Sequence, residues 1–513
     1  MEEKRSESSH GQILKSSALI GGSSAINVLI AMIRVKFTAV YLGPLGVGLV
    51  GAYNTVLGPL SVLAGMGINT SGVRQLVEAS GHGDQTQIAR SLLTIRRGAW
   101  VTGILGAILL IALSFPLAKF TFGNTDHALA LSVLSLTILI GSISGALGAI
   151  IQGLRRIRDL AAQAVLGPLI STPIAIALMI FLGVRAAIPM MLAVSLIGLF
   201  VTWFYARRIK VESVSMTWRE TWTEAKPMLH LGVTLMCAAL LGSAAAYIQR
   251  VMIIRQLGVE ANGMYTSAWN LSNYYVGFIL GAMGADFYPR LTKVNSNHAE
   301  VNRLVNEQTE VGLIMAIPGI IATLTLAPVV MMFFYTAKFT PAVAVLRWQT
   351  LGLILRLVSW PMGFIMLAKG AKGWYFWTEL ISNLISLGFM WIGIRLFGLV
   401  GAGVAFFALY VFYVFLALCV SKYLTGFAWS RHSLRLIGMT IISAIISVLV
   451  IRTLPLLYAA IVGGILAALT GCYSLRELSR LTGRNILSTA WQKLNSILGL
   501  EGRIQKLLYN YQK

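Results

Sequence analysis

Long apolar runs are the feature that most constrains the fold of this chain. Fourteen runs between charged or turn-rich breaks are long enough to cross a bilayer core, which needs about 20 apolar residues per helix. Only 12% of the 513 residues are charged, against about 25% in a soluble domain. The sequence therefore predicts an all-α polytopic membrane protein, because helices satisfy their own backbone groups in lipid. The approximate limits of the runs are 13–33, 45–70, 98–118, 128–151, 160–182, 186–206, 228–254, 263–288, 311–334, 341–368, 374–397, 399–421, 434–451 and 455–474.

The basic residues are distributed unevenly along the chain, whose formal net charge is +23. In a soluble protein this excess would suggest nucleic-acid binding, but cytoplasmic loops of membrane proteins collect Lys and Arg. When the N-terminus is placed inside the cell, every second loop and both tails hold most of the 41 Lys and Arg. This alternation predicts an even number of spans, two cytoplasmic termini and no nucleic-acid partner.

An internal duplication organises the spans. An offset of 215 to 219 residues superposes polar residues and glycines over about 180 residues. Each repeat holds six spans, so we expect two parallel six-helix lobes related by a pseudo-twofold axis along the membrane normal. Matched pairs include Arg34 with Arg250, Asn54 with Asn270, Gly153 with Gly370, Arg155 with Lys372 and Gly183 with Gly398.

The repeat also predicts the domains. Residues 1–217 form an N-terminal six-helix lobe and 218–425 a C-terminal six-helix lobe, with a cleft between them near the bilayer midplane. Residues 426–475 supply two additional transmembrane helices. Residues 476–513 form a basic amphipathic cytoplasmic tail, for which an unstructured segment is the alternative. This layout is typical of transporters with alternating access, although the duplication alone does not exclude a channel or a membrane enzyme.

Basic residues within or beside the spans are the first candidates for substrate binding, because intramembrane charge is expensive. If they face the cleft, the cleft is cationic. The alternative is that long basic side chains near helix ends extend to the headgroups. These candidates are Arg34, Lys36, Arg250, Arg255, Arg347 and Arg356.

Two asparagines form a second group of candidates. Asn54 and Asn270 are equivalent in the repeat, and they follow the aromatic residues Tyr53 and Trp269. Amides beside aromatic rings suit sugar hydroxyls, so we expect both asparagines to line the central cavity. Hydrogen bonding between helices is the alternative.

Three carboxylates are candidates for coupling to a proton or another ion, because burial raises the pKa of a carboxyl group. They are Glu379, Asp286 and Glu310. Asp286 lies four residues before Arg290 on the same helix face, so a structural ion pair is the alternative for this residue.

Motifs for enzyme chemistry are missing from the sequence. The six histidines are scattered without metal-ligand spacing, and there is no P-loop. We therefore predict no catalytic residues, no cofactor and no metal site.

Five stretches are specific as a set. They are GPLGVGLVGAYNTVLGPLSVLAGMGINTSGVRQL (43–76), QGLRRIRDLA (152–161), GFILGAMGADFYPRL (277–291), LVNEQTEVGL (304–313) and RWQTLGLILRLVSWPMGFIMLAKG (347–370). Together they resemble the bacterial O-antigen translocases, in the polysaccharide transporter family of the multidrug/oligosaccharidyl-lipid/polysaccharide exporter superfamily. The resemblance covers roughly residues 10–425. The two extra spans and the basic tail depart from the twelve-span pattern common among O-antigen members.

The resemblance implies a flippase in the bacterial inner (plasma) membrane. Its substrate would be undecaprenyl-diphosphate-linked oligosaccharide, an O-antigen or related lipopolysaccharide repeat unit, moved from the cytoplasmic to the periplasmic leaflet by alternating access. A cationic cavity would suit the diphosphate, because Arg donates charge-assisted hydrogen bonds. The implied partners are the lipid-linked glycan, membrane lipid, a proton or other ion, and polysaccharide polymerase or assembly proteins.

Two alternative functions follow from the same sequence. A drug/cation antiporter of the same superfamily would need acidic residues in the leading spans, and spans 13–33 and 228–254 contain none. A membrane glycan-transferring enzyme would need a sizeable outer loop with carboxylates or histidines. The outer loops offer only Asp126, His127 and Glu260.

Overall fold

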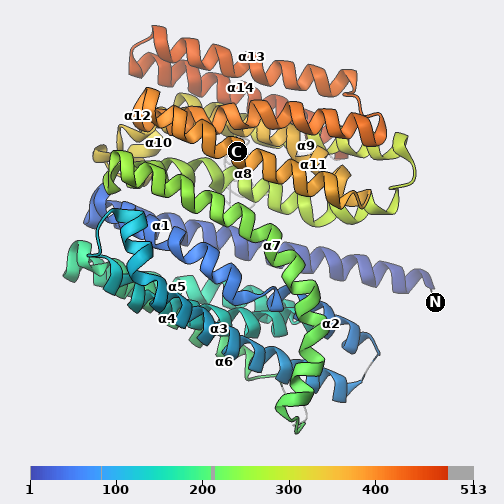
Figure 1. Cartoon of the computed structure of the whole chain (residues 1–513). Helices are drawn as coiled ribbons and strands as arrows, with labels where there is room; N and C mark the ends of the chain where they lie inside the picture. Colours follow the sequence, from blue (N-terminus) through green and yellow to red (C-terminus); the bar gives the residue numbers. More distant parts are fainter. Residues whose placement is uncertain (1, 83, 210–213, 483–513) are drawn as a thin grey trace, which may run out of the picture. The chain divides into compact units, whose positions relative to one another are not determined.

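The computed structural model describes residues 2–82, 84–209 and 214–482. These residues form helices joined by short connections, and no strand occurs among them (Figure 1). They divide into two compact units, which are described separately. Unit 1 comprises Met1–Leu271, Pro328–Val345 and Phe376–Leu409, and unit 2 comprises Ser272–Ala327, Leu346–Tyr375 and Tyr410–Lys513. The units are defined by compactness and the predicted lobes by the sequence repeat, so the lobe boundaries stay a prediction.

The helices account for every predicted span. Nine helical segments in the described part of the chain are long and apolar enough to cross a membrane, and three of these, with 61, 50 and 54 residues, are long enough for two crossings. The prediction of an all-helical polytopic membrane protein is confirmed. The elements are α1 (Glu2–Gly65), α2 (Ile68–His82), α3 (Gln85–Phe122), α4 (Ala128–Gly153), α5 (Ile157–Leu182), η1 (Gly183–Ala186), α6 (Ala187–Ala206), α7 (Trp218–Leu257), α8 (Val259–Lys293), α9 (His298–Thr325), α10 (Ala327–Phe334), η2 (Ala337–Phe339), α11 (Ala342–Ala368), α12 (Lys372–Thr425), α13 (Arg431–Thr453) and α14 (Leu456–Thr482).

Glycines divide the longest helices where the sequence predicts turns between spans. Gly43 interrupts α1 with φ 64° and ψ −170°, and Gly398 interrupts α12 with φ 56° and ψ −135°. A residue with a Cβ atom is strained at these angles, whereas glycine adopts them readily. Each of these two helices therefore contains two predicted spans.

The same breaks reveal the duplication in the backbone. Gly258, between α7 and α8, has φ 91° and ψ 170°, which resembles the conformation of Gly43. Gly183, at the end of α5, has φ 54° and ψ −135°, which nearly matches Gly398. In both pairs the partners lie 215 residues apart, so equivalent turns of the two repeats adopt similar local structures.

A third pair of turns corrects one part of the predicted alignment. The backbone hydrogen bonds of residues 150–157 recur in residues 365–372, again at an offset of 215. Arg155 (φ 53°) is thereby equivalent to Gly370 (φ 64°), not to Lys372 as the residue types suggested. Pairing Arg155 with Lys372 by residue type was wrong because the turn is defined by its backbone. The turn requires a positive φ, which Gly370 adopts easily and Arg155 adopts under strain.

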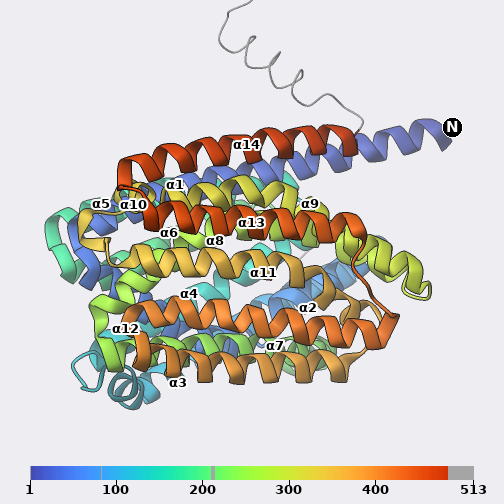
Figure 2. The same cartoon turned by 90° about the horizontal axis from the view of Figure 1, so that it is seen from above.

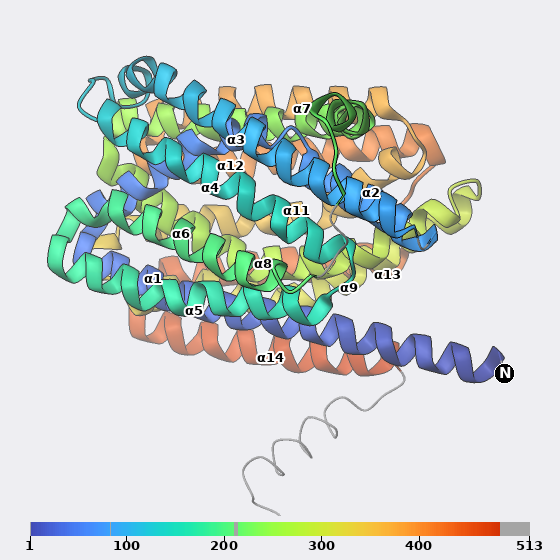
Figure 3. The same cartoon turned by 90° about the horizontal axis from the view of Figure 1, so that it is seen from below.

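Unit 1 is built largely around helices of the first half of the chain. α3 packs against α4, α4 against α6, and α1 against α5 (Figure 3). Leu76, Ile95 and Ile150 are fully buried in one apolar cluster, and Leu110 and Leu131 in another. These clusters fix the spacing of α3, α4 and α6.

Two glycines bring α1 and α8 into backbone contact within unit 1. A Cβ atom on Gly48 would lie 2.0 Å from the carbonyl oxygen of Val259, and one on Gly263 would lie 2.0 Å from that of Pro44. Gly48 and Gly263 are 215 residues apart, as are Pro44 and Val259. The crossing is therefore reciprocal: equivalent residues of the two repeats contact each other.

In unit 2, α13 and α14 pack against α9 (Figure 2). The unit has its own apolar cluster, with Leu291, Val305, Met362 and Ile365 almost completely buried. α13 and α14 overlap the residues 426–475 over which two additional transmembrane helices were predicted, and their separation from the lobes as a domain stays a prediction. Of the predicted amphipathic tail, 476–482 continue α14, and 483–513 lie outside the described residues.

Candidate functional site

Arg250 lies in a network of neutral polar groups in unit 1. Its Nη1 donates to Oδ1 of Asn262 at 3.0 Å and to Oγ1 of Thr266 at 2.5 Å. The guanidinium carbon lies 4.5 Å from the centroid of the Tyr265 ring, within cation–π range. Asn262 in turn donates to the carbonyl oxygen of Gly48 at 2.8 Å. The network ties α7 to α8 and α8 to α1 at the glycine crossing.

The other basic candidates of unit 1 lie on α1 and near the end of α7. Nζ of Lys36 donates to the carbonyl oxygens of Met332, at 3.0 Å, and Tyr335, so its charge meets the carbonyl end of α10. Arg34 is half-buried on α1. Arg255 is exposed near the end of α7, and its Nη1 would lie 2.1 Å from a Cβ atom built on Gly123. Lys36 therefore has a structural role whether or not it also contacts substrate.

Arg356 and Arg347 are half-buried in unit 2. Nη1 of Arg356 donates to Oδ1 of Asn273 at 2.8 Å, and Nε of Arg347 donates to the carbonyl oxygen of Leu324 at 3.3 Å. In the described part of the chain no carboxylate pairs with Arg250, Arg347 or Arg356. These three arginines are held by neutral oxygen atoms.

The two predicted asparagines differ in exposure. Asn54 is exposed, whereas Asn270 is half-buried. Their aromatic neighbours are packed inside unit 1: Tyr53 is 3% exposed with its hydroxyl 2.9 Å from Nδ1 of His127, and the Trp269 ring contacts Phe406 edge-on. The ring of Tyr53 is therefore part of the core and is not available to stack on a sugar.

The three candidate acids differ in their surroundings. Asp286 pairs with Arg290 at 3.2 Å on the surface, as the spacing predicted. Oε1 of Glu310 accepts hydrogen bonds from Ser430 at 3.0 Å and Ser433 at 2.6 Å, at the start of α13. Glu379 is half-buried in α12. A role in ion coupling stays a prediction for all three.

The structure distributes the candidates over both units. The direct partners of Arg250 and Arg356, Asn262 and Asn273, were missed by the sequence analysis. Both are amides within or next to the predicted span 263–288, where a polar residue is itself a signal. That the candidates line one cavity stays a prediction. Unit 1 holds Arg34, Lys36, Asn54, Arg250, Arg255, Asn270 and Glu379, and unit 2 holds Asp286, Glu310, Arg347 and Arg356.

Curated relatives align with most of the chain. The chain is 24% identical over 429 residues to the lipid III flippase of Escherichia coli (strain K12), which covers 82% of this chain and 100% of the relative. The lipid III flippase of Shigella flexneri matches to the same extent. These names describe transporters and not enzymes.

Solved structures show the same fold. The inward closed conformation of the lipid II flippase MurJ superposes with a TM-score of 0.65 at 16% identity, covering 91% of this chain and 100% of that one. An inward-facing multidrug resistance MATE family transporter of the MOP superfamily gives 0.62 at 17% identity, covering 78% and 96%. Both likenesses concern the arrangement of helices.

A family model adds the remaining comparison. The model described as polysaccharide biosynthesis protein matches residues 13–295, which is more than half of the chain and includes most of α1 and all of α2 to α8. With an all-helical fold shared with MOP-superfamily transporters, this multi-pass membrane protein belongs to the polysaccharide biosynthesis protein family.

Proposed function

We propose that the chain is a flippase of the bacterial inner membrane. Its substrate is an undecaprenyl-diphosphate-linked oligosaccharide, an O-antigen or related repeat unit, which it moves from the cytoplasmic to the periplasmic leaflet by alternating access. The family, and the alignment with lipid III flippases over 82% of the chain, support a lipid-linked glycan as the substrate class.

The observation that carries this proposal is that intramembrane arginines contact neutral groups instead of carboxylates. Arg250 and Arg356 contact the neutral amides of Asn262 and Asn273, and no carboxylate among the described residues neutralises them. An uncompensated cation within a membrane span is costly, and a diphosphate would supply the missing negative charge through charge-assisted hydrogen bonds. Sugar hydroxyls also need such a protein path, because each costs several kcal/mol to bury unpaired in hydrocarbon.

A drug or cation antiporter is not favoured by the same observation. Such a transporter needs carboxylates in the leading spans to attract its substrate, and spans 13–33 and 228–254 contain none. The likeness to MATE transporters concerns the fold.

Deletion of the gene tests the function in cells. We expect lipid-linked repeat units to accumulate on the inner leaflet of the plasma membrane and surface glycan to be lost. Normal surface glycan without accumulation would reject the proposal.

A reconstituted assay tests the site. Proteoliposomes containing undecaprenyl-diphosphate-linked oligosaccharide are assayed for glycan that becomes accessible to an added glycan-cleaving enzyme. We expect Arg356→Gln to slow flipping by about 10- to 100-fold, because a hydrogen bond to a charged group contributes about 1.5–3 kcal/mol, and Arg356→Lys to recover part of the rate.

The matched control is Arg303→Gln, which removes an exposed cation of the same unit that pairs with Glu300 and Glu307 and should leave the rate unchanged. If folded Arg356→Gln protein flips substrate at the wild-type rate, Arg356 does not bind the diphosphate.

A further inference from the structure

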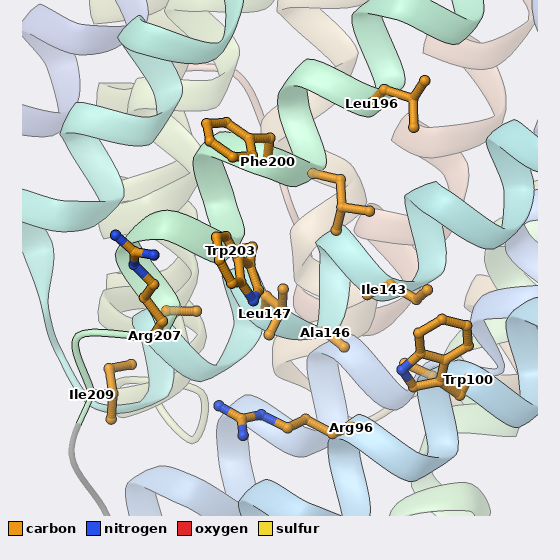
Figure 4. Close-up of a pocket in the computed structure, with 13 residues that line it drawn as sticks. Arg96, Trp100, Ile143, Ala146, Leu147, Leu196, Phe200, Trp203, Arg207 and Ile209 are labelled. Atoms are coloured by element: carbon orange, nitrogen blue, oxygen red, sulfur yellow. The ribbon is translucent and has the colours of Figure 1, made fainter.

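A second feature of unit 1 is a cavity of about 940 Å³ among α3, α4 and α6. None of the predicted substrate-binding residues lines it. In Figure 4, Arg207 lies at the left of the view, Arg96 at the bottom and Leu196 at the upper right, with apolar side chains between them. The cavity is therefore basic at one end and apolar along the rest, and its volume is within the range of about 300–1,000 Å³ of ligand sites.

Small residues create the cavity. α3 and α6 both pack against α4, and the lining includes Ala99, Ala146 and Ala206, which are 3%, 1% and 1% exposed. Because an alanine side chain ends at Cβ, these three alanines do not fill the space between the longer side chains of α3 and α6. The packing of these helices leaves the cavity as a fixed part of unit 1.

The walls of the cavity are large apolar side chains with exposed surfaces. Trp100, Leu196, Phe200 and Trp203 are 51%, 53%, 62% and 45% exposed. In a membrane-spanning protein such surfaces face lipid, and tryptophan prefers the boundary between headgroups and acyl chains. The walls thus suit a lipid chain that enters sideways from the bilayer.

The basic end has two cations without an acidic partner. Arg96 and Arg207 are exposed, and in the part of the chain that the structure describes neither forms an ion pair with a carboxylate. The guanidinium carbon of Arg207 lies 4.9 Å from the centroid of the Trp203 ring. By contrast, the neighbouring Arg97 donates to Thr221 at 2.7 Å. Two like charges beside one cavity favour an anionic ligand.

The two arginines also lie at the level expected for headgroups. Arg96 lies two residues before the apolar run 98–118 of α3, and Arg207 directly follows α6. The first part of α3 and the last part of α6 are at the same end of their helical layer (Figure 3).

We propose that this groove binds an anionic phospholipid of the bilayer. Arg96 and Arg207 hold the phosphate of the headgroup, and an acyl chain lies along Trp100, Trp203 and Phe200. Bulk phospholipid greatly outnumbers any lipid-linked intermediate, so mass action fills the groove with phospholipid. A ligand that binds only the folded protein also stabilises it, so the lipid should strengthen the packing of α3, α4 and α6.

The experiment measures phospholipid that stays bound to the purified full-length protein. Protein in neutral detergent is mixed with phosphatidylglycerol, phosphatidylcholine or inorganic phosphate, and native mass spectrometry counts the retained molecules while unfolding temperatures are recorded. We expect phosphatidylglycerol to be retained and to raise the unfolding temperature, with little effect of the other two. The double variant Arg96→Gln/Arg207→Gln should retain about tenfold less phosphatidylglycerol.

Arg208→Gln is the matched control, because Arg208 is exposed beside Arg207 but does not line the cavity, and it should retain lipid like the wild type. Equal loss in Arg208→Gln, or equal retention of phosphatidylcholine, overturns the proposal. So does stoichiometric displacement of phosphatidylglycerol by undecaprenyl-diphosphate-linked glycan, which would make the groove a substrate site. If the double variant does not fold, Phe200→Ala tests the apolar wall, and unchanged retention in that variant contradicts the assignment. None of these readouts depends on flipping, so they remain informative if the proposed function is wrong.

Discussion

Gly398 shows how one residue sets the path of a 54-residue helix. Its φ of 56° turns the chain inside α12, and a Cβ atom at this position would meet nothing within 4 Å. Gly398→Ala should therefore destabilise the protein only through backbone strain, by about 1–2 kcal/mol. The measurement is the unfolding temperature of the purified protein in detergent.

Gly388 is the matched control in the same helix, because it is helical and equally uncrowded. Gly388→Ala should be neutral or stabilising, by up to about 1 kcal/mol. Equal destabilisation of both variants would show that the turn at Gly398 does not need a positive φ.

His127 links stability to pH at the end of a helix. It directly precedes α4, is half-buried against the Phe122 ring and lies 2.9 Å from the Tyr53 hydroxyl. Burial lowers the pKa of His127, and the nearby Asp126 opposes this shift in part. Because the folded state resists protonation, its contribution to stability is present above about pH 6.5 and is lost as the pH falls.

Unfolding temperatures between pH 7.5 and 5 measure this effect. His127→Gln should lose less stability on acidification than the wild type. His298→Gln, at the exposed start of α9, is the control and should retain the wild-type pH dependence. The same acid-induced loss in His127→Gln as in the wild type would assign it to another group.

For single residues, the sequence indicated which polar side chains matter more reliably than it indicated the residues that they contact. The cost of intramembrane charge singles out Lys36 and Arg250 without any structure. Their partners depend on how distant helices pack: Lys36 bonds to Met332, 296 residues away in the chain. No local pattern specifies such a contact, and the Asp286–Arg290 pair was predictable because it lies within one helix turn.

At the scale of elements, the crossing of α1 and α8 depends on two glycines. Gly48→Ala would place a Cβ atom 2.0 Å from the backbone oxygen of Val259, and a backbone atom cannot rotate away as a side chain can. We expect a loss of at least about 3 kcal/mol, seen as a lower unfolding temperature or a lower yield of monodisperse protein. Gly263→Ala should behave alike, because the contact is reciprocal.

Gly58→Ala is the control for this crossing, since a Cβ atom on that α1 residue would meet open space. Stability equal to that of Gly58→Ala in both crossing variants would mean that α1 and α8 do not approach so closely.

The sequence predicted the helices and their order. It was least accurate in the alignment of the two internal repeats. Hydropathy located the helices because length and apolar character are local properties. The offset of the repeat drifted to 217 near Arg155, since matching residue types is an indirect measure of matching backbone. Positive-φ turns at Gly43, Gly183, Gly258 and Gly398 give the constant offset of 215. The cavity among α3, α4 and α6 was not predictable, because it results from alanines on three separate helices.

At the scale of the molecule, the proposed function makes transport respond to the membrane potential. The substrate carries a negatively charged diphosphate, and moving one charge through 100 mV changes its free energy by about 2.3 kcal/mol. An uncoupled flippase should therefore shift the distribution of substrate between leaflets on the order of 50-fold per net charge at 100 mV. Proteoliposomes with a potassium diffusion potential and no pH gradient provide the measurement.

The opposite potential is the internal control and should reverse the shift. If the distribution instead follows an imposed pH gradient and ignores the potential, protons must neutralise the charge moved, which would favour Glu379 or Glu310 as coupling groups. Glu379→Gln and Glu310→Gln would then separate the two, because only the residue that carries the proton should lose the response to the pH gradient. Glu310 also accepts the serine hydroxyls that hold α13 against α9, so its variant needs a matching measurement of stability before a lost response is assigned to proton transfer.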